Sequence, residues 1–526
     1  MDLQIFKGIS RYRLVLTAGL IFYLVILVRT AWVCDDAYIS FRTVDNFVNG
    51  YGLRWNVDER VWTYTNPLWV LLFSGIYAVT REAHVTSIVV SVVLALTGVT
   101  IFVRGLSRSA ATAALCLSAF IFSKGFIDYS TSGLENVLTH GLLAVFLVIW
   151  IKAERTFRSL FWLSFVAGLV TVNRMDSLIL VLPALAYAWW EQRSWRATWL
   201  VVSGFAPFII WESFALVYYG FLVPNTYFAK THVDIAQWEL FKQGARYLWE
   251  SIFRDHVIMP VIITGVISAF LSRNRRQIAI AVGIVLFIFY LLKVGGDFMS
   301  SRFLTAPFVC GVALLAMLPL PERGLRRFIP LITLIVLGMT ARGAAVLSGR
   351  TFGTNGENDK TIIGVADERA WYYQQTGLFR LEQDSIRFSD REWGYRAFVG
   401  SLDRDSIIVI GNIGFRGYFA GPQRYIVDEC ALSDPLLSKL PCDTSNGWRV
   451  GHFRRKLPTG YLQTLTSGQN QIEDRSLAEY NDHLQTVVRG KPFTVARFRE
   501  ILAFNTGAYD TLLREYARNL SASAER

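Results

Sequence analysis

The chain has 526 residues, of which 53% are apolar, 14% are aromatic and 18% are charged, and its formal net charge is +12. An ordinary soluble enzyme would contain about 25% charged residues. The low charged fraction and the mean hydropathy of +0.35 therefore exclude a soluble enzyme, and they also exclude a disordered chain, a collagen and a coiled coil. The five unevenly spaced cysteines exclude a disulfide scaffold and a zinc site. The sequence therefore predicts a membrane protein.

Apolar segments near the length that crosses a bilayer, about 20 residues, predict about eleven membrane-spanning helices. They lie at roughly 14–33, 85–103, 110–123, 138–151, 159–172, 177–190, 197–219, 256–271, 277–293, 303–319 and 327–347. A further apolar stretch, Pro67 to Thr80, is predicted to lie on or dip into the outer leaflet instead of crossing it. The predicted fold class is therefore an α-helical polytopic membrane protein.

Charge indicates how these helices are oriented. When Pro67 to Thr80 does not cross, the loops on the side of the N-terminus hold sixteen lysines and arginines against four acidic residues, and this difference equals the whole net charge of +12. Cytoplasmic loops of membrane proteins are enriched in Lys and Arg. The pattern predicts a cytoplasmic N-terminus. It also explains the net positive charge without a nucleic-acid partner.

This topology divides the chain into a transmembrane domain of residues 1–347 and an extracytoplasmic soluble domain of residues 348–526. The strand-like run at 406–410 and the turn residues that follow it predict a small α/β domain. Cys430 and Cys442 lie in this domain, and an oxidising compartment would permit a disulfide between them, which the sequence leaves open.

Polar loops of unusual composition all fall on the outer side under this topology. Ionisable groups at membrane depth tend to line a cavity, so their convergence predicts a site, although one such group taken alone is better explained as an interfacial anchor or a helix cap. The candidate site residues are Asp35, Asp36, Tyr64, Glu135, Arg174, Asn225, Lys230, His232, Asp297 and Arg302.

Asp35 and Asp36, directly after the first span, are the candidate catalytic residues. Adjacent carboxylates at this position fit three roles, and the sequence leaves all three open. They would cap the helix that follows, act as a general base whose pKa is raised by the neighbouring charge, or bind a divalent cation. No cofactor is otherwise indicated.

Four cationic residues are candidates for binding the phosphate of a membrane-embedded donor. The guanidinium of Arg binds phosphate through two parallel hydrogen bonds, and the ammonium of Lys binds it through its compact charge. If a group is transferred from such a donor, the largest electrostatic task is to stabilise the negative charge that develops on the leaving phosphate. These residues are Arg174, Lys230, His232 and Arg302, and the pocket would be completed by Tyr64, Glu135, Asn225 and Asp297.

Several stretches resemble the GT-C superfamily of polyprenyl-phosphate-sugar-dependent glycosyltransferases, and more narrowly the AftB family of mycobacterial terminal arabinofuranosyltransferases. The similarity runs over nearly the whole chain. The matching stretches are Asp35 to Arg42, Tyr64 to Trp69, Ser132 to Glu135, Tyr219 and Gly220, Pro224 to Thr226, Gly295 to Met299, Ala420 to Pro422, Asp434 to Leu437 and Gly451 to Phe453.

The resemblance implies a GT-C fold in a bacterial inner membrane and transfer of D-arabinofuranose outside the cytoplasm. The donor would be of the decaprenyl-phosphate-arabinofuranose type, and the acceptor would be an envelope glycan or glycoconjugate. Whether the sugar's configuration is retained or inverted stays open, since a single displacement by an acceptor activated at Asp36 would invert it.

Two other classes of protein compete with this hypothesis. A multi-span transporter or flippase of a polyprenyl-linked glycan would also contain intramembrane charges, but it predicts polar groups on both halves of its pathway and matched repeats. A non-catalytic assembly or receptor protein would leave the clustering of the polar loops unexplained.

Overall fold

The structure is a computed structural model that describes residues 2–231, 233–319, 324–354, 361–383, 407–445 and 447–524. The chain packs into two compact units. Unit 1 comprises Met1–Cys34, Glu82–Phe208 and Gln237–Ser385, and unit 2 comprises Asp35–Arg81, Ile209–Ala236 and Ile386–Arg526. The predicted domain boundary at residues 347 and 348 stays a prediction, and the described residues that follow it up to 383 pack in unit 1.

Unit 1 is almost entirely helical. Its α-helices are α1 (Asp2–Thr30), α4 (His84–Leu106), α5 (Ala110–Phe122), α6 (Lys124–Asp128), α7 (Asn136–Lys152), α8 (Phe157–Asn173), α9 (Leu178–Gln192), α10 (Trp195–Gly204), α13 (Gln237–Arg254), α14 (Ile258–Ser272), α15 (Arg275–Val294), α16 (Thr305–Ala316), α17 (Ile329–Thr340) and α18 (Glu368–Thr376), and α11 (Ala206–Tyr218) begins in it. Its short elements are η1 (Met175–Ser177), η2 (Arg302–Leu304), η3 (Leu325–Phe328), η5 (Leu378–Gln383), β1 (Thr361–Ile362) and β2 (Val365–Ala366).

The eleven predicted apolar segments all coincide with described helices, with α10 and α11 together covering 197–219. Three helices, α1, α4 and α15, are long and apolar enough to cross a membrane, and the number rises to five if the bent pairs α10 with α11 and α13 with α14 each count as one span. Further apolar helices in the described part are shorter, at 10–17 residues. The count of eleven spans stays a prediction.

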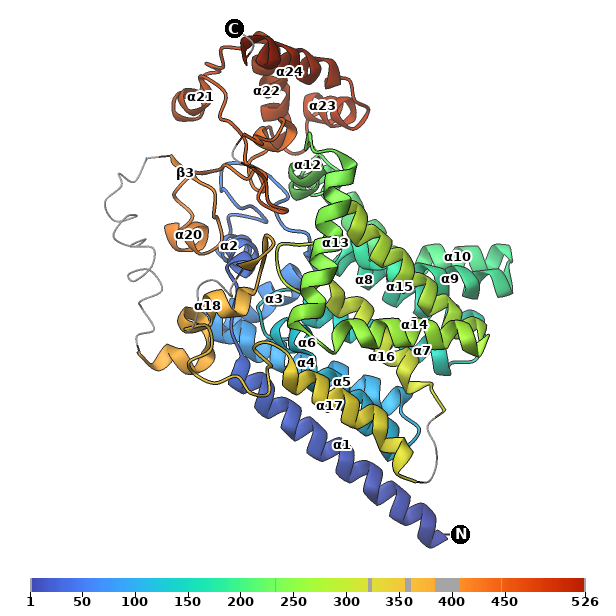
Figure 1. The fold of residues 1–526 in the computed structure, drawn as a ribbon. Helices are drawn as coiled ribbons and strands as arrows, with labels where there is room; N and C mark the ends of the chain where they lie inside the picture. Colours follow the sequence, from blue (N-terminus) through green and yellow to red (C-terminus); the bar gives the residue numbers. More distant parts are fainter. Residues whose placement is uncertain are drawn as a thin grey trace. The chain divides into compact units, whose positions relative to one another are not determined.

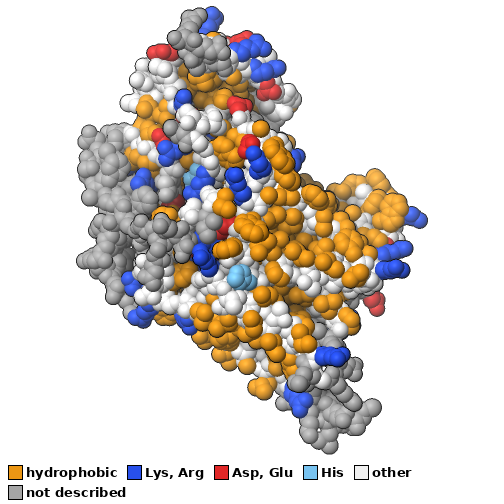
Figure 2. Space-filling view, in the orientation of Figure 1, with side chains coloured by type: hydrophobic (Ala, Val, Ile, Leu, Met, Phe, Trp, Pro, Cys, Tyr) orange, Lys and Arg blue, Asp and Glu red, His pale blue; other side chains and the backbone are white. Residues whose placement is uncertain are grey.

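Apolar side chains cover the surface of several unit 1 helices (Figure 2). On α14 and α15, which pack side by side (Figure 1), Ile267, Leu271 and Phe289 are more than half exposed. A soluble protein rarely exposes a large continuous apolar patch. Such a surface is the one that a helix presents to lipid, and it agrees with the composition of the chain.

Four helices of unit 1 form the row that carries the candidate site. In this row α7 packs on α8, α8 on α9 and α9 on α15. Side chains cap helices at one end of the row: Thr156 accepts the Ser159 N–H at the start of α8, and Asn274 accepts the Arg276 N–H at the start of α15. These caps satisfy backbone donors that a helix start leaves unpaired.

Unit 2 combines helices with a small sheet. Its elements are α2 (Asp35–Val48), α3 (Pro67–Thr80), α12 (Asn225–Thr231), β3 (Ile408–Ile410), α20 (Phe415–Ala420), β4 (Ile426–Asp428), η6 (Leu437–Lys439), α21 (Tyr461–Ser467), α22 (Arg475–Val488), α23 (Val495–Asn505) and α24 (Asp510–Ala524). Strands β3 and β4 are parallel, with Ile408 opposite Ile426. The strand predicted at 406–410 is therefore found at Ile408–Ile410, and residue 406 lies outside the described residues.

Two apolar cores hold unit 2 together. The larger core joins β4 and α22 through Val427, Leu477 and Leu484, and α23 and α24 pack on α22 (Figure 1). The smaller core packs Ile39 of α2 and Trp55 against β3 and β4. The segment after the first predicted span thus folds together with the C-terminal part of the chain.

Candidate active site

A buried ion pair joins the start of α7 to the end of α8. Arg174, the residue that follows α8, pairs with Glu135, the residue that precedes α7. Its guanidinium also donates to both carboxylate oxygens of Asp176, with its Nε 3.0 Å from Oδ1 and its Nη2 3.1 Å from Oδ2. Three of the five N–H donors of Arg174 are therefore engaged, which fixes the guanidinium in place.

The loop after α15 brings Asp297 and Arg302 to the same end of the row. Gly295 ends α15 with a φ of 84°, and Gly296 follows with a φ of 73°. A Cβ on Gly296 would lie 2.5 Å from the Cβ of Tyr247, so only glycine fits this turn. The chain then turns so that the Arg302 Nε lies 3.4 Å from Asp297 Oδ2.

One face of α13 supports this loop. The Tyr247 hydroxyl accepts the Phe303 N–H at 3.0 Å, and Glu250 accepts the Ser300 hydroxyl at 2.8 Å. Arg254, one turn further along, lies 2.5 Å from Glu250. The sequence prediction missed these residues, although Tyr247, Glu250 and Arg254 recur at helical spacing on the buried face, a signal that was available.

A short strand clamps the same loop from another part of the chain. The Ala366 N–H donates to the Phe298 carbonyl at 2.7 Å, and the Ser300 N–H donates to the Ala366 carbonyl at 2.9 Å. Asp367, the next residue, lies 3.0 Å from the Lys124 ammonium and 3.4 Å from Arg254. Burial raises the pKa of Asp367, but the charges of Lys124, Arg254 and Arg369 outweigh it and hold that pKa at about 2. The clamp therefore rests on an ionised carboxylate.

The two guanidiniums lie on one aromatic ring. The Arg174 and Arg302 guanidinium carbons are 4.4 Å and 5.3 Å from the centre of the Phe303 ring. Burial raises the pKa of Glu135, but the charges of Arg174 and Arg302 outweigh it and hold that pKa below its usual value. The structure thus brings together four of the predicted site residues, Glu135, Arg174, Asp297 and Arg302.

The two arginines of this cluster differ in how tightly they are held. Arg174 makes short contacts with Glu135 and Asp176, whereas Arg302 is 3.4 Å from its carboxylate partner and donates to the Met299 sulfur at 2.9 Å. A thioether is a weak acceptor. The contact between Arg302 and Asp297 is longer than the contacts that hold Arg174.

The adjacent carboxylates Asp35 and Asp36 lie in unit 2, in the first turn of α2. Asp35 is 6% exposed, and its Oδ1 accepts the Phe415 N–H at 2.8 Å at the start of α20. Gly414 approaches so closely that a Cβ there would lie 2.4 Å from the Asp35 carboxylate carbon. Asp36 is only partly buried. Asp35 therefore joins α2 to α20, and Asp36 is the more exposed residue of the pair.

Asp35→Asn is expected to flatten the pH dependence of stability between about pH 4 and pH 7. Burial raises the pKa of Asp35 to about 7 from 3.8, the Phe415 N–H opposes this, and the charge of Asp36 adds to it. The folded state therefore holds this proton more tightly than the unfolded state, so the stabilisation is present below the ordinary pKa and is lost as the pH rises to about 7. Asparagine still accepts the Phe415 N–H and has no proton to lose.

Melting temperatures of the purified protein across this pH range test the expectation. Asp58→Asn is the matched control, because Asp58 is an exposed carboxylate of the same unit. An Asp35→Asn variant whose melting temperature changes with pH as steeply as that of the wild type would contradict the assignment of this proton to Asp35.

Three further predicted site residues, Tyr64, Asn225 and Lys230, lie in unit 2, and the first two already make hydrogen bonds. Asn225 donates to the carbonyls of Ala431, Leu432 and Asp434 at 3.0, 3.1 and 3.0 Å, and its Oδ1 accepts the Ser438 hydroxyl at 2.8 Å. The Tyr64 hydroxyl lies 2.9 Å from that of Tyr219 within an aromatic cluster.

These contacts give Asn225 and Tyr64 clear structural roles, which leaves their assignment to a substrate pocket a proposal. Lys230, in the last turn of α12, is exposed. His232 lies outside the described residues.

Two alternatives raised by the sequence concern cysteines and metals. Cys430 and Cys442 are both described, and they do not form a disulfide in the structure. Within the described ranges, no group of three or more His, Cys, Asp or Glu side chains is arranged to hold a metal ion.

Two curated proteins resemble this chain in sequence, and both are named terminal beta-(1->2)-arabinofuranosyltransferase. The protein from Mycobacterium tuberculosis is 28% identical over 403 residues, which are 66% of this chain and 63% of that protein. The protein from Corynebacterium glutamicum is 25% identical over 355 residues, 57% of this chain and 49% of that protein. The chain thus spans less than two thirds of the length of these relatives. No protein-family model matches it.

A solved structure shares the fold. ArnT from Cupriavidus metallidurans, in its crystal structure with undecaprenyl phosphate, superposes with a TM-score of 0.50 at 13% identity, over 80% of this chain and 86% of ArnT. The resemblance to GT-C glycosyltransferases is confirmed. The fold is that of a mostly helical GT-C protein, and the apolar helices agree with it.

Proposed function

We propose that this chain is a membrane glycosyltransferase that moves a sugar, D-arabinofuranose, from a polyprenyl-phosphate donor to an envelope glycan or glycoconjugate. The names of the two sequence relatives support the sugar, and the lipid in the ArnT structure supports the class of donor. The observation that carries the proposal is the largely buried cluster of Glu135, Arg174, Asp176, Asp297 and Arg302 at one end of the helix row.

Arg302 is proposed to receive the donor phosphate, because its guanidinium lies 3.4 Å from Asp297, a longer contact than those that join Arg174 to Glu135 and Asp176. The cluster contains three carboxylates and two guanidiniums, so it carries more negative than positive charge. A bound phosphate therefore needs a further cation. Lys230 and His232 are proposed for this role, and a divalent cation is the alternative.

Asp36 is proposed to take the proton of the acceptor hydroxyl. The acceptor oxygen then forms a bond to C1 of the sugar, and the bond between C1 and the phosphate oxygen breaks. Its electron pair leaves with the polyprenyl phosphate, whose growing charge Arg302 stabilises. One displacement of this kind inverts the anomeric carbon, and two successive displacements retain its configuration.

The membrane topology belongs to the same proposal. We place the protein in the bacterial inner membrane with eleven spans, a cytoplasmic N-terminus, and the site and residues 348–526 outside the cytoplasm. The excess of lysine and arginine in the loops on the N-terminal side supports this orientation. Helix α3 would then lie in the outer leaflet.

Transfer of radiolabelled arabinofuranose from decaprenyl phosphate to a glycan by the purified protein in vesicles tests the proposal. Transferred label is the expected result. Movement of the lipid-linked sugar across the vesicle without transfer would instead favour the transporter or flippase, and neither activity would favour an assembly protein. The same lipid phosphate carrying a hexose is the control for the donor sugar.

A further inference from the structure

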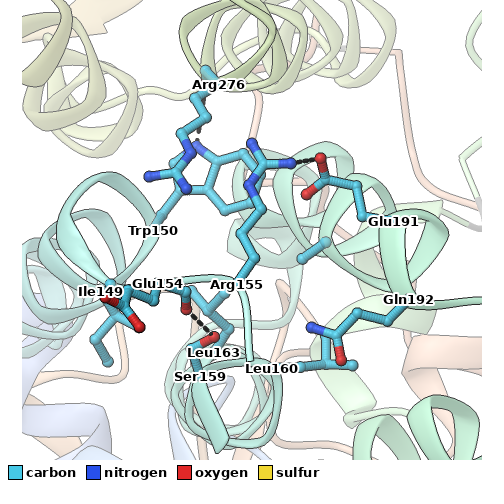
Figure 3. A pocket seen from close by; sticks show the side chains of 12 residues that line it. Ile149, Trp150, Glu154, Arg155, Ser159, Leu160, Leu163, Glu191, Gln192 and Arg276 are labelled. Carbon is cyan, nitrogen blue, oxygen red and sulfur yellow. Dashed lines mark hydrogen bonds and ion pairs between the residues drawn. The ribbon is translucent and has the colours of Figure 1, made fainter. Parts of the chain in front are cut away.

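A pocket lies at the other end of the helices that carry the candidate site (Figure 3). It is an open pocket lined at the end of α7, the start of α8, the end of α9 and the start of α15. Helix α7 has 17 residues, which at 1.5 Å per residue gives a length of about 25 Å. The pocket is therefore separate from the cluster around Glu135 and Arg302.

Positive charge dominates this end of the row. The loops 152–158, 191–196 and 273–276 contain eight lysines and arginines and two glutamates. Two of the cations, Arg155 and Arg276, line the pocket, together with Glu154 and Glu191. Arg155 forms an ion pair with Glu191, and its side chain is 32% exposed. Burial and the charges of Arg276 and Arg275 lower the pKa of Arg155. This crowding of cations favours an anionic ligand.

The pocket is built in advance of any ligand. The Arg276 guanidinium donates to the Ile151 carbonyl at 2.9 Å, and the Trp150 indole N–H donates to the Arg276 carbonyl at 3.1 Å. The Tyr187 ring lies 5.1 Å from the Arg155 guanidinium carbon, and its hydroxyl bonds with Arg155 and Arg275. Figure 3 shows Arg155 and Arg276 beside the Trp150 ring. The cations are therefore held close together by contacts between helices.

Exposed tryptophans surround this end of the row. Trp190, Trp195 and Trp199 are 57%, 74% and 56% exposed, and the Arg193 guanidinium carbon lies 5.2 Å from the centre of the Trp190 ring. Tryptophan is enriched where a membrane meets water. Basic pockets between helices at this depth suit anionic lipid headgroups.

We propose that this pocket binds the headgroup phosphate of an anionic phospholipid. The phosphate would lie between Arg155 and Arg276, with Arg275 contributing charge at the rim. The acyl chains would follow the apolar outer surface of the row. This inference is independent of the proposed transfer reaction, since it concerns the opposite ends of the helices.

Lipid retention by the purified full-length protein tests the inference. The protein is incubated in mixed micelles of phosphatidylcholine and phosphatidylglycerol, repurified, and its retained lipids are counted by mass spectrometry. The wild type is expected to retain phosphatidylglycerol preferentially. In the double variant Arg155→Gln and Arg275→Gln, that preference should fall about fivefold for each arginine removed.

The double variant Arg104→Gln and Arg108→Gln is the matched control. It removes the same charge from exposed arginines at the loop between α4 and α5, outside the pocket, and should keep the preference. Equal losses in both double variants would overturn the pocket as the site, and so would an unchanged preference in Arg155→Gln and Arg275→Gln. Melting temperatures in phosphatidylcholine show whether each variant is folded.

Inorganic phosphate separates a lipid site from a simple anion site. A lipid that is held by both its headgroup and its chains should remain bound when phosphate is added in excess. Complete release of phosphatidylglycerol by inorganic phosphate would overturn the proposal of a lipid site.

Discussion

Replacing Asp36 with asparagine is expected to reduce sugar transfer by about 10²- to 10⁴-fold, the usual contribution of a positioned general base. Asparagine keeps the size of the side chain but cannot accept a proton from the acceptor hydroxyl. Asp36 is the member of the pair suited to this task because it is partly exposed, whereas Asp35 is buried and accepts the Phe415 N–H.

The measurement is the initial rate of transfer from the labelled donor, with the melting temperature as a check on folding. Asp35→Asn is the matched comparison, since it makes the same change at the adjacent position. We expect Asp35→Asn to retain more activity than Asp36→Asn because its hydrogen bond to Phe415 survives. A variant at Asp36 that transfers at the wild-type rate would exclude it as the base.

The sequence grouped four candidate residues that the structure also brings together, and they form the cluster in unit 1. Glu135 precedes α7, Arg174 follows α8 and Asp297 follows α15. Helices that alternate in direction bring these chain positions to the same end of the row, so a count of apolar segments was enough to group them. Contacts between the side chains, such as the two hydrogen bonds from the Arg174 guanidinium to Asp176, could not be predicted from the sequence.

The sequence could not separate residues that hold the fold from those available to a ligand. Asn225 belongs to a matching stretch, yet its amide already bonds three backbone carbonyls and a serine hydroxyl. A residue type in a pattern carries no information about which hydrogen bonds it already makes.

The clamp on the loop after α15 was missed for a related reason. Arg254 and Asp367 are 113 residues apart, and the predicted domain boundary at 347 and 348 falls between them. The helical spacing of Tyr247, Glu250 and Arg254 indicates a buried face of α13, but no local pattern identifies a partner 113 residues away. The doublet of Asp367 and Glu368 beside Arg369 was visible, but its partners Lys124 and Arg254 were not.

Arg302→Gln is expected to lower the transfer rate by about 10²- to 10³-fold, the loss typical when one donor to a developing negative charge is removed. The loss of stability should be smaller than that of Arg174→Gln, because Arg302 lies 3.4 Å from Asp297 and Asp297 Oδ1 keeps the Phe298 N–H at 2.9 Å. Arg302→Lys should recover part of the transfer rate, since lysine restores the positive charge but lacks the paired N–H donors of the guanidinium.

Arg174→Gln is expected to lower stability more than it lowers the transfer rate per folded molecule. It is therefore the comparison that makes the Arg302→Gln result decisive. Removing Arg174 leaves Glu135 and Asp176 without their shared guanidinium, and breaking a buried pair of this kind costs about 3–5 kcal/mol. Its main effect should therefore be a lower melting temperature. If Arg302→Gln instead lost stability as Arg174→Gln does and kept its rate per folded molecule, Arg302 would be a structural residue and the donor phosphate would have to bind elsewhere.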